Sequence, residues 1–182
     1  MALDQTKKWT ESGLSVPVSV NLSVRMLEDN DLPKYLAHAL QVRNLPASCL
    51  TFELTETMAM SNIEQTEKMF NQLSALGVKT SIDDFGVGFT SLHYLQQLHV
   101  SEIKIDKTFV VDLQRNFRSK AIIQAIVILA EGLGTSVVVE GIEDIGLIEQ
   151  LHKLGCHFGQ GYSIARPMRS EKFNDWRLNW SN

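Results

Sequence analysis

The 182-residue sequence predicts an α/β fold, a TIM-type (β/α)8 barrel that is incomplete, with about six of the eight strands present. Three observations predict this fold. Runs rich in β-forming residues alternate with helical stretches, glycines stand where the helices would end, and polar residues gather at the carboxyl ends of the β runs. Alternation of helices and strands is typical of a parallel sheet.

The β runs and helices follow from residue type and spacing. We expect strands at 17–23, 50–56, 79–83, 102–106, 135–141 and 157–163. Apolar residues at helical spacing predict helices at 63–76, 119–133 and 147–154, with a further helix around 91–98. Leu-Gly pairs occur at 76–77, 133–134 and 154–155. Glycine adopts the left-handed conformation that ends a helix at low cost, so each pair predicts a helix end followed by a strand.

The polar residues at the strand ends separate two kinds of α/β fold. A doubly wound sheet builds its site at one switch point from a few strands, whereas a barrel builds it from nearly all strands at one rim. A single acid at a strand end is commonly a helix cap or a solvated loop residue. Here nearly every run contributes, which favours the barrel: Asn21, Glu53, Glu56, Asp83, Asp84, Lys104, Asp106, Glu140, Glu143 and Gln160.

Composition excludes several classes of protein. Hydrophobic residues make up 44% and charged residues 21%, and no Pro/Ser-rich linker interrupts the chain, so we expect one globular domain over 1–182. The net charge of −4 and the lack of a basic block argue against a duplex nucleic-acid binder. No signal peptide is recognisable, and the longest apolar run, AIIQAIVILA at 121–130, is too short to span a bilayer. We expect this run to form a buried helix in a cytoplasmic protein without a membrane segment.

Cys49 and Cys156 lack the spacing of metal ligands and are expected to be buried free thiols.

Two adjacent aspartates, Asp83 and Asp84, end one β run. Neighbouring carboxylates repel, and neighbouring side chains on a regular strand point to opposite faces. Divalent cations would make the pair favourable. Oxygen donors from Asn21, Glu53, Asp83 and Asp84 suit Mg²⁺ or Mn²⁺, while the histidines form no HxH or HxxxH pair that would suggest zinc. Two such ions with a water between them are the usual arrangement for phosphodiester hydrolysis.

Lys104 and the segment 85–88 have two readings each. Lys104 could hold the water or offset phosphate charge, or it could form a structural ion pair with a barrel carboxylate. The Phe-Gly-Val-Gly sequence at 85–88 could be a moving lid or a close approach to phosphate, but a plain turn is the simpler interpretation.

Six motifs resemble those of the EAL-domain family in order and spacing: NLS at 21–23, ELTE at 53–56, DDFG at 83–86, KID at 104–106, EGIE at 140–143 and QGY at 160–162. The resemblance extends from about Val16 to Met168. It implies a (β/α)8 barrel that hydrolyses cyclic di-GMP to linear pGpG with Mg²⁺ or Mn²⁺.

The resemblance also implies roles for single residues. Asn21, Glu53 and Asp83 would hold one metal ion, with Asp83 bridging to a second ion that Asp84 holds. The catalytic group would comprise Lys104, which contacts the water, with Glu140, Asp84 and Gln160 beside it. Glu56 would anchor the loop after DDFG, with Glu143 and Asp106 supporting the site from behind. The candidates for substrate contact are Phe85, Gly86, Arg166 and Pro167.

One departure from the family pattern stands out. The sequence contains no Glu-Ala-Leu motif, whose glutamate is a metal ligand on the first strand of the family's barrel, nor the arginine that follows it. We therefore expect the first strand or strands to be missing, the cation site to be weakened and a homodimer to form through the broken barrel edge. Two functions remain open: an impaired cyclic di-GMP phosphodiesterase, or an inactive module that binds cyclic di-GMP or a protein partner.

Overall fold

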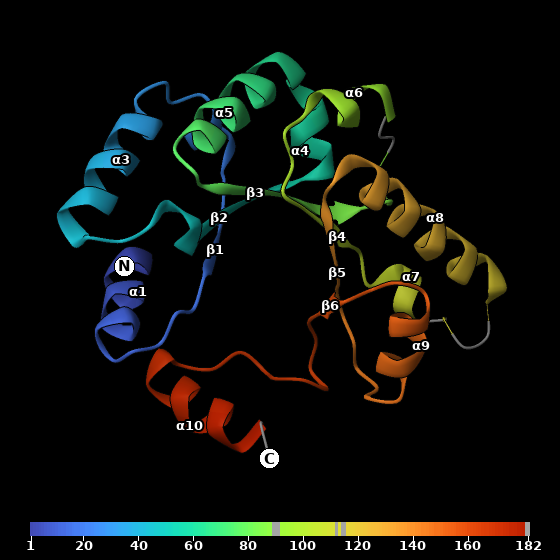
Figure 1. Cartoon of the computed structure of the whole chain (residues 1–182). Coiled ribbons are helices and arrows are strands. Elements are labelled where there is room, and N and C mark those ends of the chain that lie inside the picture. Colours follow the sequence, from blue (N-terminus) through green and yellow to red (C-terminus); the bar gives the residue numbers. More distant parts are fainter. Residues whose placement is uncertain (89–91, 112, 114–115, 181–182) are drawn as a thin grey trace.

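In the part of the chain that the computed structural model describes, six parallel strands form one sheet (Figure 1). The structure describes residues 1–88, 92–111, 113 and 116–180. Each strand pairs with its neighbour in sequence, in the order β1-β2-β3-β4-β5-β6. The bounds are β1 Val18–Asn21, β2 Leu50–Thr55, β3 Lys79–Phe85, β4 Glu102–Ile105, β5 Ser136–Val139 and β6 Phe158–Gly159. All six expected strands are confirmed, although β6 has only 2 residues.

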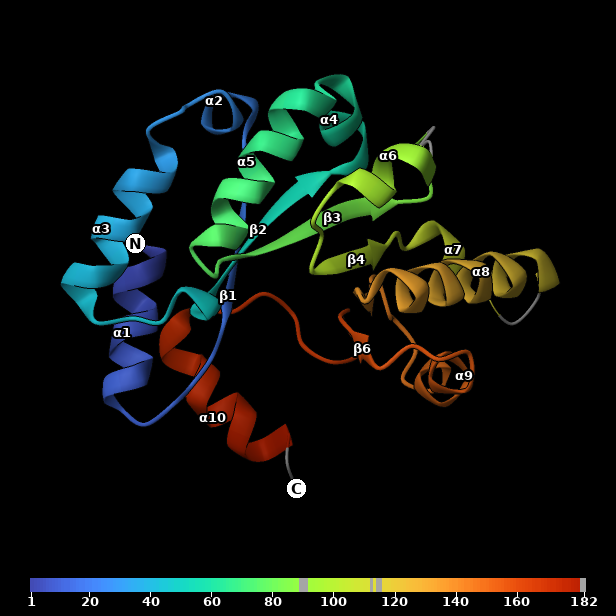
Figure 2. The same ribbon diagram turned by 45° about the horizontal axis from the view of Figure 1, so that its top comes forward.

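The sheet is curved into a half-barrel, with the helices from α3 to α9 around its outer side and α10 on its open side (Figures 1 and 2). They are α1 Ala2–Glu11, α2 Val24–Leu27, α3 Leu32–Arg43, η1 Ala47–Cys49 (a 3-10 helix), α4 Glu56–Ser61, α5 Ile63–Ala75, α6 Leu92–Gln97, α7 Thr108–Val111, α8 Phe117–Leu133, α9 Leu147–Lys153 and α10 Ser170–Trp180. The expected helices correspond to α5, α6, α8 and α9, and Ser91 of the expected fourth helix lies outside the described residues. The Leu-Gly prediction is also confirmed, because Gly77, Gly134 and Gly155 have φ values of 84°, 68° and 92°.

The two faces of the sheet differ in polarity because side chains alternate along a strand. Outward-facing residues such as Ile82, Ile103 and Val139 are fully buried against the helices. Helix α5 contributes Met69 and Phe70 to this core, both at most 1% exposed. The inner face of the half-barrel is polar instead, with its members drawn from five strands: Asn21, Thr51, Glu53, Ser81, Asp83, Glu102, Lys104 and Ser136. The polar and charged side chains of the strands are therefore concentrated inside the half-barrel.

Helix α8 is not fully buried, contrary to the sequence expectation for its apolar run. One side packs on the sheet through Ile123, Ile126 and Val127. The other side is exposed, with Phe117 at 77% and Ile128 at 62%. Among the described residues, no helix is long and apolar enough to cross a membrane.

Both cysteines are free as expected. Cys156 is buried, whereas Cys49 is only partly buried.

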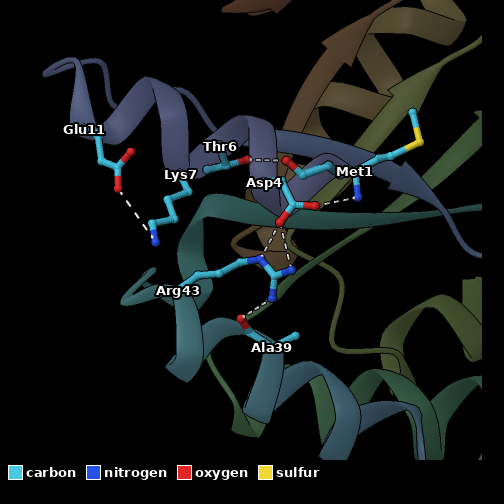
Figure 3. A network of polar contacts seen from close by, with 8 residues as sticks. Met1, Asp4, Thr6, Lys7, Glu11, Ala39 and Arg43 are labelled. Atoms are coloured by element: carbon cyan, nitrogen blue, oxygen red, sulfur yellow. Dashed lines mark hydrogen bonds and ion pairs between the residues drawn. The ribbon is translucent and has the colours of Figure 1, made fainter.

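One polar contact and one aromatic contact hold helix α1 against the rest of the chain. The carboxylate of Asp4 accepts hydrogen bonds from Arg43 of α3 at 2.9 and 2.8 Å, and Arg43 also donates to the carbonyl of Ala39 at 3.1 Å (Figure 3). The hydrogen bond from the N-terminal ammonium, followed by that from Arg43, lowers the pKa of Asp4. On another side of α1, the ring of Trp9 lies 5.2 Å from that of Phe173 in α10. The first and last helices of the chain are therefore in contact.

Candidate metal centre

A bulge at the end of β3 places both aspartates on the inner rim. Ile82 pairs with Ile103 and Phe85 pairs with Ile105, so β3 has one residue more than β4 between these pairs. Asp84 has a φ of 54°, a left-handed conformation in which aspartate is enriched among non-glycine residues. Such bulges re-aim a side chain, commonly next to a functional site. Phe85 consequently returns to the core, and Asp83 and Asp84 lie close together instead of on opposite faces.

Three carboxylates converge at this rim. Oxygen atoms of Asp83, Asp84 and Glu140, which follows β5, all lie within 4.8 Å of one another. The side-chain amide of Gln160 donates a hydrogen bond of 2.6 Å to Glu140 Oε1 and so fixes that carboxylate. The backbone N–H of Asp84 donates to Asp83 Oδ1 at 3.1 Å. This group is a candidate binding site for a divalent cation.

Lys104 lies among these carboxylates and is only 4% exposed. Its Nζ forms ion pairs with Glu140 Oε1 at 2.7 Å, Asp83 Oδ1 at 3.0 Å and Glu53 Oε2 at 3.3 Å. Burial acts to lower the pKa of Lys104, but the hydrogen bonds to Glu140 and Asp83 and the charge of Glu53 outweigh burial, so the pKa is raised. The lysine is therefore charged at neutral pH. The structural ion pair considered for Lys104 is present, and it involves three partners.

Asn21 and Glu53 adjoin this group on the neighbouring strands. Asn21 of β1 pairs in register with Glu53 of β2. Glu53 is linked to the other carboxylates by its ion pair with Lys104. The three mutually close carboxylates do not include Glu53. The structure thus brings Asp83, Asp84 and Glu140 together most tightly.

The charges of the centre favour a cation. Burial raises the pKa of Glu140, as do the charges of Asp83 and Asp84, against the opposing effect of Lys104. Burial also raises the pKa of Asp84, followed by the charges of Asp83 and Asp106. A site made of carboxylate oxygens fits a hard divalent ion such as Mg²⁺ or Mn²⁺, and a bound ion would relieve this repulsion.

We expect Asp84→Asn to stabilise the protein in EDTA by roughly 0.5–1 kcal/mol, the scale of a partly exposed charge contact. The pKa of Asp84 is raised above its ordinary value of 3.8 in the folded state, so ionisation costs stability as the pH rises past that value. The gain should therefore be full at neutral pH and absent below the ordinary pKa. Urea unfolding at several pH values measures it, and a loss of stability at neutral pH would contradict the repulsion.

Glu56 holds the loop that follows the aspartates. It lies at the start of α4, is 1% exposed and accepts hydrogen bonds from the backbone N–H groups of Gly86 at 2.7 Å and Gly88 at 3.2 Å. Gly86 has a φ of 100°, and a Cβ built there would lie 2.8 Å from the ring of Phe109. Only glycine fits this position without strain.

We expect Gly86→Ala to destabilise the protein by about 1–3 kcal/mol because of the positive φ and the contact with Phe109. Urea unfolding measures the change. Repeating the substitution in a Phe109→Ala background removes the ring contact and leaves the backbone strain. A Gly86→Ala protein as stable as the parent would show that this loop conformation is not required.

The remaining candidate residues lie outside the three-carboxylate group. Phe85 is 5% exposed and belongs to the core, so its side chain is not on the rim. Asp106 is 8% exposed, and its Oδ1 accepts a hydrogen bond of 2.9 Å from the N–H of Thr108 at the start of α7. Exposed Glu143, Arg166 and Pro167 line a hollow of about 610 Å³ next to Gln160.

Sequence reasoning did not identify three features of the site. Ser81 donates a hydrogen bond of 3.1 Å to Glu102, one layer below Lys104 inside the half-barrel. Phe109 occupies the space beside Gly86, and the guanidinium of Arg166 lies 4.7 Å from the ring centroid of Tyr162. The alternation along β3 and β4 could have paired Ser81 with Glu102. No local signal marks the two aromatic contacts.

The fold and site define a class of protein: a TIM-type barrel, present here as six strands, with an acidic centre at the carboxyl ends of the strands. A family profile described as the EAL domain matches residues 1–167. The chain therefore belongs to the EAL domain family.

Named relatives and solved structures agree with this assignment. The chain is 37% identical over 150 residues to the cyclic di-GMP phosphodiesterase PdeB of Shewanella oneidensis, covering 82% of this chain and 18% of PdeB. It superposes on a structure of the Pseudomonas aeruginosa MucR phosphodiesterase in complex with c-di-GMP with a TM-score of 0.87, at 38% identity, covering 94% of this chain and 70% of that one. For a manganese and cyclic di-GMP complex of Klebsiella pneumoniae BlrP1 the TM-score is 0.84, at 28% identity, with 93% and 43% covered. The chain thus spans less than a fifth of the length of PdeB.

Proposed function

We propose that this chain is an EAL-type phosphodiesterase unit that binds cyclic di-GMP with Mg²⁺ or Mn²⁺ and hydrolyses it to linear pGpG, with reduced activity as an isolated 182-residue chain. The carrying observation is the convergence of Asp83, Asp84 and Glu140 within 4.8 Å beside Lys104, in a chain of this family. The solved neighbours that contain cyclic di-GMP support the choice of substrate.

The proposed division of labour follows from the contacts. Asp83 and Asp84 would hold the cations, with Glu53 and Asn21 completing the oxygen donors on the adjacent strands. Divalent cations, when bound, supply Lewis-acid stabilisation of phosphate charge. Gln160 orients Glu140 through its hydrogen bond. The ammonium of Lys104 is held where it can donate to a water or to a phosphate oxygen.

Glu56 has a positioning role in this proposal. By accepting the N–H groups of Gly86 and Gly88 it fixes the loop directly after the two aspartates. Arg166 and Pro167 line the hollow beside Gln160 and are the proposed substrate contacts on that side. Phe85 is not among them because its side chain is buried in the core.

A second candidate is a module that binds cyclic di-GMP or a protein partner without turnover. One observation favours it: the carboxylates of Glu53, Asp83 and Glu140 are all engaged by the ammonium of Lys104. Cations that bind these oxygens must compete with a buried positive charge.

Calorimetry with cyclic di-GMP in Ca²⁺ and in EDTA, followed by a turnover assay with Mg²⁺ or Mn²⁺ on the same sample, tests both candidates. We expect binding that requires the cation and slow formation of pGpG. Binding without pGpG would favour the non-catalytic module. Absence of binding under all conditions would overturn both assignments of cyclic di-GMP as the ligand.

A further inference from the structure

The turn after β6 is fastened to the segment that follows β5. The N–H of Ile142 donates a hydrogen bond of 3.1 Å to the carbonyl of Gln160, and the carbonyl of Ile142 accepts the N–H of Ser163 at 3.0 Å. The hydroxyl of Ser163 donates to the same carbonyl at 2.6 Å. Ile142 is only 3% exposed. Both ends of the turn 160–163 are therefore bound to one buried residue.

The turn 160–163 has no room to shift toward Ile142. A Cβ built at Gly161 would overlap the backbone N, C and O atoms of Ile142. Close approach of two backbones in this way requires glycine. The N–H of Ile164 donates back to the carbonyl of Gly161 at 3.0 Å, which closes the chain beyond the turn. The place of Gln160 on the rim therefore depends on how the turn is held against Ile142.

Gln160 is the residue that this turn presents to the carboxylate centre. Its backbone N–H donates to the carbonyl of Val139 at 2.8 Å, and its side-chain amide donates to Glu140 Oε1 at 2.6 Å. The ammonium of Lys104 is bonded to the same Oε1 at 2.7 Å. Because both donors are on Oε1, Oε2 is the oxygen that a cation can approach without displacing them. The orientation of the Glu140 carboxylate therefore depends on the position of Gln160.

The hydroxyl of Ser163 is a side-chain contribution to this arrangement. A backbone carbonyl has two lone pairs, so the carbonyl of Ile142 can accept the N–H and the hydroxyl of Ser163 together. The hydroxyl bond fixes the far end of the turn, as the N–H of Ile142 fixes its start at Gln160. A substitution at Ser163 can therefore loosen the turn and leave its backbone hydrogen bonds in place.

We propose that Ser163 is a positioning residue of the metal centre, which acts through the turn 160–163 on Gln160 and through Gln160 on Glu140. Without the hydroxyl, the far end of the turn is held less firmly, and the amide of Gln160 leaves Glu140 more often. The effect on turnover rests on the proposed function. The hydrogen bond between Gln160 and Glu140, in contrast, is present in the protein without metal or substrate.

Nuclear magnetic resonance of the Gln160 side-chain amide tests the proposal in EDTA. The signal pair that disappears in Gln160→Glu assigns this amide. We expect its hydrogen-bonded proton to exchange slowly with solvent in the parent, faster in Ser163→Ala, and as in the parent in Ser163→Thr, which keeps the hydroxyl. Ser163→Ala should fold because its N–H still bonds to Ile142, and circular dichroism and urea unfolding check this.

Ser136→Ala is the matched control. The hydroxyl of Ser136 donates to the carbonyl of Ser101 at 3.0 Å, so it is also a partly buried hydroxyl bonded to a backbone carbonyl distant in sequence. Ser136 begins β5, whereas Glu140 follows the end of that strand. Ser136→Ala should lower the free energy of unfolding and leave the Gln160 signal unchanged. The control thus separates positioning of Gln160 from a general loss of stability.

With Mn²⁺ and cyclic di-GMP, Ser163→Ala should lower kcat by about 5- to 10-fold with KM unchanged, near the lower end of the effect of groups that support metal ligands. Ser163→Thr should restore kcat. An unchanged Gln160 signal in Ser163→Ala, or equal changes in Ser163→Ala and Ser136→Ala, would overturn the proposal. Absence of pGpG with the parent would overturn the proposed function alone, because the Gln160 signal still decides the role of Ser163.

Discussion

Replacing Lys104 by methionine is expected to destabilise the protein by about 3–5 kcal/mol in EDTA at neutral pH, the usual cost of removing one partner from a buried ion pair. The ammonium of Lys104 is the shared counter-charge of Glu53, Asp83 and Glu140, at 2.7–3.3 Å. Without it, partly buried carboxylates face one another with no compensating charge. Urea unfolding of parent and variant measures the difference.

The pH dependence of this effect has a defined sign. The pKa of Lys104 is raised in the folded state, so its stabilising contribution is complete below the ordinary value of 10.5 and is lost only in stronger alkali. At low pH the stabilising contribution of Lys104 is lost through its partners, because a protonated carboxyl group has no negative charge for the ammonium to neutralise. Burial raises the pKa of Glu140, so the difference between parent and variant should begin to shrink while the pH is still above the ordinary glutamate value of 4.5.

The exposed ion pair of Lys153 with Glu149 is a matched control. Its N–O distance is also 2.7 Å, but the two side chains are 70% and 78% exposed. Lys153→Met should change the free energy of unfolding by less than about 1 kcal/mol. Equal effects of Lys104→Met and Lys153→Met would contradict the central role given to Lys104.

Replacing Glu56 by alanine is expected to destabilise the protein by about 3 kcal/mol, since hydrogen bonds to a charged group contribute roughly 1.5–3 kcal/mol each and their loss leaves buried groups unpaired. Glu56 is 1% exposed and accepts the N–H groups of Gly86 and Gly88, in the loop after Asp84. Urea unfolding measures the loss. Amide hydrogen exchange at Gly86 and Gly88 should rise with it, which locates the effect in the loop.

Glu56→Gln is the control for that experiment. The amide oxygen can still accept an N–H, so this variant should lose less stability than Glu56→Ala and should retain more protection at Gly86. If alanine and glutamine gave the same exchange rates as the parent, the loop would not depend on these hydrogen bonds.

The order of strands and helices was predictable because alternation of residue type repeats at every unit. Runs such as 79–83 and 102–106 coincide with β3 and β4, and the glycines at 77, 134 and 155 end their helices as expected. The collection of acids at one rim was predictable for the same reason. The carboxyl ends of parallel strands meet at one end of the sheet.

The close contact between Asp83 and Asp84 was not predictable from alternation. A regular strand would separate them, and only the bulge with Asp84 at a φ of 54° brings them to one face. The threefold pairing of Lys104 depends on the curvature that brings β2, β3 and β5 around β4. Substrate contact by Phe85 was a plausible reading of the motif, but the same bulge turns Phe85 into the core.

The exposure of α8 illustrates a further limit of sequence reasoning. An apolar run such as 121–130 predicts burial, but hydrophobicity does not say whether the covering surface belongs to the same chain or to another. The structure shows that the chain covers one side only.

The central claim is that the rim of carboxylates is a divalent-cation centre. A Mn²⁺ titration monitored by electron paramagnetic resonance of the free ion tests it most directly, with parent, Asp83→Asn and the surface control Asp29→Asn. We predict binding to the parent and to Asp29→Asn, with affinity about 100-fold weaker or worse in Asp83→Asn, because the loss of a direct ligand should cost at least as much as the loss of an outer supporting group. Equal affinity of parent and Asp83→Asn, or no Mn²⁺ binding by the parent, would contradict the claim.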